Sequence, residues 1–134
     1  MAEDVVTAEV AGDLVAAYLA AWTERRSAAR RRLLEACWDD EGNYSSWTTN
    51  VHGLDAMDAH IAAAQRQQPR LCRRVPTCDL HVSGDKVSFT WSLVDQGGAV
   101  LVEGSDWAEI GAGGQLARVT SFAGRPEAAD KPVS

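Results

Sequence analysis

A period of two in the hydrophobic pattern of the C-terminal half most constrains what this chain can fold into. In DKVSFTWSLVD, the apolar residues at positions 87, 89, 91 and 93 alternate with serine and threonine, which is typical of a half-buried β-strand. The following DQGG is typical of a hairpin turn, and a second alternating strand, AVLVEGSDWAEI, comes after it. Residues 116–122 predict a last strand after GAGG. The C-terminal half is therefore expected to be sheet.

The N-terminal half has the spacing of helices instead. In TAEVAGDLVAAYLAAWTERR, apolar residues at positions 10, 14, 18 and 22 predict an amphipathic helix that begins after Thr7. A second helix, AARRRLLEAC, is expected after Ser27 with its arginines in solvent, and GLDAMDAHIAAAQRQQP predicts a third after a short strand. This order predicts an α+β domain, with three helices on one face of a mostly antiparallel sheet.

Length and charge limit the classes of protein to which the chain can belong. With 134 residues, it is expected to form a single domain over residues 1–124, followed by a disordered tail at 125–134. The net charge of -6 argues against a nucleic-acid partner. The acidic N-terminus and the lack of a long apolar run predict no signal peptide and no membrane partner, so the cytoplasm is the expected compartment.

Metal and disulfide chemistry are not expected. The three cysteines include no CxxC pair, and we expect them to be reduced and mostly buried. The three histidines lack ligand spacing, so neither a metal nor another cofactor is predicted. His60 borders the buried stripe of the third helix, where it could act as a second acid or base. The alternative is a capped, half-exposed histidine.

Asp106 is the most informative residue of the sequence, because strand alternation turns it inward. Its neighbours on the same face, Gly104 and Ala108, are small, so a space is expected around the carboxylate. Burial in an apolar space raises the pKa of a carboxyl group, so Asp106 could donate a proton near neutral pH. The alternative is a structural carboxylate that a helix or strand partner satisfies.

Aromatic residues are expected around Asp106. Tyr18 belongs to the apolar stripe of the first helix, and Asp106 could be the partner of its hydroxyl, although a core tyrosine that reaches water is the alternative. By parity, Trp91 points inward to the cavity, and Trp107 points outward to a subunit interface, with plain core packing as the alternative for each. Because Leu101 shares the outer face with Trp107, we expect a homodimer through that face.

Five segments, in order, carry a family resemblance: AYLAAW, EACWDDEGNY, VHGLDAMDAHI, VSFTWSLVDQGGAVLVEGSDWAEI and GGQLARVTSFAG. Together they span roughly residues 13–124 and resemble the SnoaL-like branch of the nuclear transport factor 2 superfamily. The resemblance implies a cone-shaped α+β barrel, in which a curved sheet and the helices enclose a cavity. That superfamily contains isomerases, cyclases, epoxide hydrolases and binding proteins, so the fold does not define the chemistry.

The resemblance also implies roles for single residues. Ketosteroid isomerases of this superfamily have an oxyanion-hole tyrosine on the first helix, which resembles Tyr18, and a protonated aspartate on a late strand, which resembles Asp106. In many relatives the run after the DDEG-like turn ends in Asp-Pro, and the isomerases use that aspartate as the base. Ser46 and Trp47 stand there in this chain, so the base is missing. Steroid-type isomerase activity is therefore not expected.

The run that follows the second helix is expected to form a cavity wall. Its acids, residues 39–41, are expected in a solvated turn, whereas Tyr44, Ser46 and Asn50 could present hydroxyl and amide groups to a ligand. The residues expected to bind the ligand are Trp22, Trp38, Ser46, Trp47, Asn50, Phe89, Trp91 and Gly104.

Two functions fit these observations. The first is a cofactor-independent enzyme that cyclises, isomerises, dehydrates or opens the epoxide of a small apolar, polyketide-like molecule. Asp106 would be its acid or base, Tyr18 its hydrogen-bond donor, and Tyr44 or His60 a second proton carrier. The second is a binding protein that holds a small apolar ligand in the same cone without turnover.

Overall fold

The computed structural model describes residues 8–68, 71–77 and 80–123. Its helices are α1 (Ala8–Thr23), α2 (Ser27–Cys37) and α3 (Leu54–Arg66). Its strands are β1 (Trp38–Ser45), β2 (Asn50–His52), β3 (Arg73–Pro76), β4 (His81–Ser83), β5 (Lys86–Val94), β6 (Val100–Ile110) and β7 (Leu116–Ala123). The predicted cap at Thr7, the burial of Cys78 and the tail at 125–134 lie outside the described residues.

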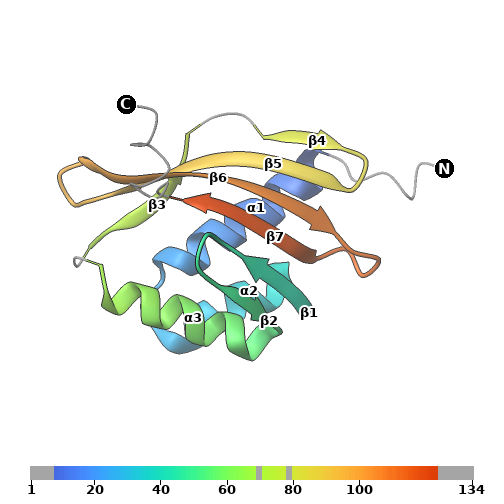
Figure 1. The fold of residues 1–134 in the computed structure, drawn as a ribbon, viewed down its shortest axis with the longest axis horizontal. Helices are drawn as coiled ribbons and strands as arrows, with labels where there is room; N and C mark the ends of the chain where they lie inside the picture. Colours follow the sequence, from blue (N-terminus) through green and yellow to red (C-terminus); the bar gives the residue numbers. More distant parts are fainter. Residues whose placement is uncertain (1–7, 69–70, 78–79, 124–134) are drawn as a thin grey trace.

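The described strands form one curved, mostly antiparallel sheet. Their order is β2-β1-β7-β6-β5-β3, with β4 also paired to β5, and the β1–β7 pair is parallel. Figure 1 shows the helices on one face of this sheet, with α1 crossing behind the long strands and α2 and α3 near the β1–β2 pair. The predicted α+β cone fold is confirmed.

The alternating pattern of β5 and β6 decides which side chains face the helices. In β5, Val87, Phe89, Trp91 and Leu93 are all buried, as their period of two predicts. The register places Phe89 opposite Asp106 and Trp91 opposite Gly104, so these four residues share the inner face. At the start of β6 the pattern fails, because a register shift between Leu93 and Val94 leaves Val100 exposed.

The buried stripe of α1 packs against this inner face. Tyr18 and Trp22 lie in it, together with Ala11, Leu14, Val15, Leu19 and Ala21. Val10, expected in the same stripe, is 46% exposed, because it lies at the edge of the stripe in the first turn of the helix. The two aromatic side chains of α1 therefore reach the centre of the molecule.

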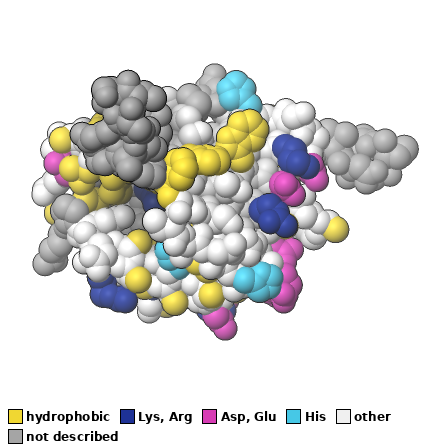
Figure 2. All heavy atoms as spheres, in the orientation of Figure 1, with side chains coloured by type: hydrophobic (Ala, Val, Ile, Leu, Met, Phe, Trp, Pro, Cys, Tyr) yellow, Lys and Arg dark blue, Asp and Glu magenta, His cyan; other side chains and the backbone are white. Residues whose placement is uncertain are grey.

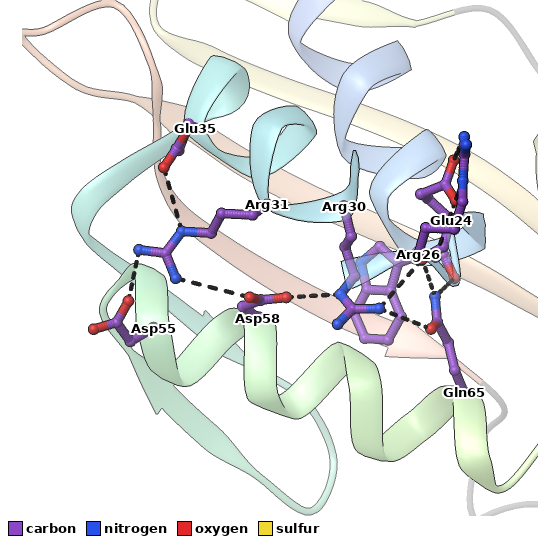
Figure 3. Close-up of polar contacts among 9 residues, drawn as sticks. Glu24, Arg26, Arg30, Arg31, Glu35, Asp55, Asp58 and Gln65 are labelled. Atoms are coloured by element: carbon purple, nitrogen blue, oxygen red, sulfur yellow. Dashed lines mark hydrogen bonds and ion pairs between the residues drawn. The ribbon is translucent and has the colours of Figure 1, made fainter. Parts of the chain in front are cut away.

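A buried ion pair joins α2 to α3, as Figure 3 shows. Arg30 Nε donates to Asp58 Oδ1 at 2.7 Å, and Arg30 Nη1 donates to Gln65 Oε1 at 3.2 Å. Gln65 Nε2 in turn donates to the carbonyl oxygens of Trp22 and Glu24 at the end of α1, each at 2.9 Å. The expectation that all arginines of α2 lie in solvent is wrong for Arg30, because α3 covers that face of α2.

The acids at residues 39–41 lie in β1, not in a turn as expected. The pairing of β1 with β7 shifts between Trp38 and Asn43, so this stretch bulges out of the ladder and its side chains stay partly or fully exposed. Gly42 allows the bulge to close, since a Cβ there would lie 2.7 Å from Trp38 Nε1. The bulge thus turns Trp38 into the core.

The outer face of the sheet carries apolar side chains. Figure 2 shows hydrophobic atoms gathered on the side away from the helices. Trp107 is 57% exposed there, and Leu101 and Phe122 are exposed as well. No helix in the described ranges is long and apolar enough to cross a bilayer.

Candidate functional site

Asp106 lies at the centre of the molecule, on the inner face of β6, with no exposed surface. Its Oδ1 accepts a hydrogen bond of 2.7 Å from the hydroxyl of Ser121, which lies opposite it on β7. Its Oδ2 is buried without a hydrogen-bond partner among the described residues. Burial raises the pKa of Asp106, and the Ser121 hydroxyl, the Trp91 indole and the charge of Arg74 only partly oppose this effect.

The space expected beside Asp106 is occupied, and that part of the sequence interpretation is wrong. A Cβ added to Gly104 would meet the Trp91 ring in direct overlap, because the indole lies against the glycine. The two residues are cross-strand partners, so the large side chain on β5 fills the gap that the glycine leaves on β6. Gly104 therefore makes room for Trp91 and does not leave an open space beside Asp106.

Tyr18 is fully buried in α1, and its hydroxyl has no hydrogen-bond partner among the described residues. The bond to Asp106 that the sequence made possible is absent. Burial, followed by the charge of Asp106, raises the pKa of Tyr18 well above its ordinary value, so the phenol stays protonated. Tyr18 can therefore donate a hydrogen bond to an oxygen that enters this interior.

Aromatic rings surround Tyr18 and connect it to α3. Tyr18 stacks on Trp38, with ring centroids 6.0 Å apart, and meets Phe89 edge to face at 6.1 Å. Trp22 contacts both Tyr44 and His60, with centroids 5.7 Å apart in each case, and Tyr44 lies 5.3 Å from His60. The fold therefore brings together most of the predicted site residues, namely Tyr18, Trp22, Trp38, Tyr44, His60, Phe89, Trp91 and Asp106.

Tyr44 and His60 lie toward the α3 side of this cluster. Burial raises the pKa of Tyr44, although the hydroxyls of Ser121 and Ser46 oppose the shift. Burial, with a smaller contribution from the charge of Arg74, lowers the pKa of His60. The half-buried His60 imidazole is therefore neutral near pH 7 and suited to accept a proton.

Two residues of the cluster were not anticipated from the sequence. Ser121 donates a hydrogen bond to Asp106, and the guanidinium carbon of Arg74 lies 3.7 Å from the ring centroids of both Trp22 and Trp91. Burial lowers the pKa of Arg74, and its Nε and Nη1 atoms are buried without partners in the part of the chain that the structure describes. In the sequence, Arg74 is one of two adjacent arginines, and no alternating apolar residues flank them. The sequence therefore did not indicate that the Arg74 side chain points inward.

Other predicted ligand contacts lie outside this cluster. Trp47 is 45% exposed, where its ring meets Phe122, and Asn50 is exposed at the start of β2. Ser46 is half-buried beside Tyr44. We therefore keep Ser46 in the candidate site and leave Trp47 and Asn50 out of it.

The chemistry that this interior offers is that of proton transfer and hydrogen bonding. Within the described ranges, no group of three or more His, Cys, Asp or Glu side chains is placed to hold a metal ion. Among the described residues, no hydrogen bond is made by Asp106 Oδ2, by the Tyr18 hydroxyl or by the buried indole N–H groups of Trp22, Trp38 and Trp91. Such a concentration of unpaired polar atoms in a core is costly, and it is a common property of ligand sites.

The comparisons with known proteins agree with the fold. No family model and no curated protein matches the chain. A proposed isomerase of the SnoaL-like family from Agrobacterium tumefaciens is 26% identical, with a TM-score of 0.77 over 82% of this chain and 93% of that one. A proposed polyketide cyclase from Sinorhizobium meliloti is 17% identical, with a TM-score of 0.60 over 81% of this chain and 93% of that one.

A third structure is a protein with a ketosteroid isomerase-like fold from Catenulispora acidiphila, in complex with trimethylamine. It is 15% identical, with a TM-score of 0.63 over 84% of this chain and 85% of that one. At these identities the second and third structures support the fold alone. Together with the isomerase of the SnoaL-like family, to which this chain is similar, they show that the chain has the fold of the nuclear transport factor 2 superfamily.

Proposed function

We propose that the chain is a cofactor-independent enzyme that acts on a small apolar, polyketide-like molecule by acid–base catalysis. The observation that carries this proposal is that a buried carboxyl group and a buried phenol lie in the same interior, and each has an oxygen without a hydrogen-bond partner among the described residues. These atoms are Asp106 Oδ2 and the Tyr18 hydroxyl, and buried aromatic and aliphatic side chains surround them.

The protonation states favour donation to a ligand oxygen. Burial disfavours the carboxylate form of Asp106, and a protonated carboxyl group can donate from its free oxygen. Tyr18 is protonated as well, so two donors would converge on one carbonyl or epoxide oxygen. Such donors stabilise the negative charge that develops when a carbonyl compound forms an enolate.

Enolisation also requires a base that removes the α-proton, and we assign this role to His60. Its pKa is lowered, so the neutral imidazole is available near pH 7. Tyr44 packs against it and would relay or orient the proton. The reaction class that fits these groups best is enolisation, a step shared by isomerisation and by cyclisation through a carbon nucleophile. Dehydration and epoxide opening use the same acid with a different substrate.

Hydrogen exchange tests this proposal without the natural substrate. Apolar ketones with acidic α-hydrogens, such as 2-tetralone, would be incubated with the protein in heavy water, and deuterium uptake would be measured by mass spectrometry. We expect exchange faster than in buffer, and a loss of about a hundredfold in the Asp106→Asn variant. Asp13→Asn, which changes an exposed acid on α1, is the control and should exchange as the parent does.

A binding protein without turnover is the second candidate. Trp91 fills the space beside Gly104, whereas an apolar pocket beside α1 includes neither Asp106 nor Tyr18 in its lining, so a ligand bound there would not contact the acid or the phenol. If every ketone of the panel exchanges at the buffer rate while an apolar ligand still binds, the binding protein is the better description.

A further inference from the structure

An apolar groove lies between α1 and the sheet, next to the candidate site. Its volume is about 370 Å³, within the range of small-molecule pockets. Val15 and Leu19 of α1, Phe89 of β5 and Leu80 line it, and Arg74 is the one charged residue among the described lining residues. Phe89 also contacts Tyr18 and lies opposite Asp106, so the groove adjoins the interior cluster.

The Arg74 side chain is held in a fixed orientation. Its guanidinium carbon lies 3.7 Å from the ring centroids of both Trp22 and Trp91, so the rings cover the guanidinium, and its Nε and Nη1 atoms have no hydrogen-bond partner among the described residues. The backbone N–H of Arg74 donates to Thr23 Oγ1 at 3.0 Å, which fixes β3 to the end of α1. The guanidinium is therefore positioned before any ligand arrives.

This cation has no counter-charge in contact with it. Arg74 makes no ion pair with any described residue, and its Nε and Nη1 atoms are buried without acceptors. The acid that shares the interior, Asp106, accepts its hydrogen bond from Ser121, and its burial favours the neutral form. A buried charge without an acceptor is unfavourable, so an acceptor from outside the chain would stabilise it.

We propose that Arg74 binds the carboxylate of an apolar ligand whose body lies in the groove along α1. A carboxylate is a planar acceptor that matches the in-plane N–H groups of a guanidinium. The apolar walls suit a hydrocarbon or aromatic body, and they offer no other charge to compete for the head group. The proposal extends the proposed function by naming the substrate class, although binding of the head group does not require turnover.

The test compares two probes of equal chain length, decanoate and 1-decanol, by titration calorimetry near neutral pH and below the micelle concentration of decanoate. We expect decanoate to bind at least tenfold more tightly, because a charge-assisted hydrogen bond distinguishes the two. In the Arg74→Met variant, the affinity for decanoate should fall about tenfold to a hundredfold, whereas that for 1-decanol should stay the same. The matched control is Arg73→Met, an exposed arginine on the same strand, which should leave both affinities unchanged.

A groove variant keeps the test valid if Arg74→Met does not fold. Ala16 is exposed and lines the groove, so Ala16→Trp should fold and weaken the binding of both probes at least tenfold. Equal affinities of the unmodified protein for the two probes would overturn the proposal, as would decanoate binding that neither Arg74→Met nor Ala16→Trp weakens.

The outcome is separable from that of the proposed function. Asp106→Asn should keep its affinity for decanoate, because Asp106 is not the group that binds the carboxylate. If decanoate binds through Arg74 but no ketone exchanges, the proposed enzymatic function fails and the binding site stands. If ketones exchange but decanoate binds no better than 1-decanol, the proposed enzymatic function stands and the carboxylate site at Arg74 fails.

Discussion

Replacing Asp106 with Asn should make the protein progressively more stable, relative to the unmodified chain, as the pH rises. The amide oxygen of Asn can still accept the hydrogen bond from Ser121, so the change keeps the shape and that contact. It removes the carboxyl proton, and with it the cost of ionising a buried group that has one unpartnered oxygen. The effect should therefore depend on pH and not on packing.

The size of the effect follows from the raised pKa. An unfolded chain releases the Asp106 proton near the ordinary aspartate pKa of 3.8, whereas the native protein retains it to a higher pH. Between these two values, the free energy of unfolding falls by about 1.4 kcal/mol for each pH unit from this group alone. The stability that Asp106 contributes is thus fully present below the unfolded-state pKa and is lost as pH rises through the folded-state pKa. For a domain of this length, 1 kcal/mol corresponds to roughly 3–5 °C in Tm.

The assay is thermal unfolding of both proteins by circular dichroism, from about pH 5 to about pH 8. We expect the Tm of Asp106→Asn, relative to the unmodified chain, to rise across this range. Asp13→Asn, at an exposed position of α1, should show no such trend. If the difference in Tm between Asp106→Asn and the unmodified chain is constant with pH, or falls as pH rises, Asp106 is a stabilised carboxylate and the reasoning is refuted.

Three further predictions test the packing, the assembly and the missing base. Gly104→Ala should lower the free energy of unfolding by about 1–3 kcal/mol in urea denaturation, since its Cβ overlaps the Trp91 ring, and an unchanged midpoint would contradict this. The protein should sediment as a dimer at micromolar concentration, and Trp107→Lys, on the exposed sheet face, should yield monomer; a monomeric parent chain would refute the predicted interface. Ketosteroid isomerisation should be negligible in the unmodified chain, and Ser46→Asp should raise it; efficient activity of the unmodified chain would show that Ser46 does not stand at the position of the base.

The inward direction of Asp106 could be predicted because an antiparallel strand has only two faces. Once Val87, Phe89 and Trp91 define a buried face on β5, alternation along β6 assigns Asp106 to the same side. The packing around it could not be predicted in the same way. Gly104 leaves a space only if its cross-strand partner is small, and that partner is Trp91. Alternation within one strand carries no information about the neighbour.

Ser121 and Arg74 could not be predicted for different reasons. The register of the last hairpin shifts between Glu109 and Ile110, and this irregularity brings Ser121 opposite Asp106. Counting back from the Ile110–Leu116 pair without that shift would place Thr120 there instead. Arg74 lies on a four-residue strand that is only partly buried, so no apolar repeat defines which of its two arginines turns inward. Tertiary contacts with α1 decide which of the two arginines points inward.

The pKa of Asp106 in the ligand-free protein tests the account most directly. It can be measured by an NMR titration of the side-chain carboxyl carbons, with the Asp106 signal assigned from its loss in Asp106→Asn. The account predicts a pKa above the ordinary aspartate value of 3.8, because burial outweighs the single hydrogen bond from Ser121. A pKa at or below 3.8 would show that the protein stabilises a carboxylate at this position, and it would contradict the proposal that Asp106 is held ready to donate a proton.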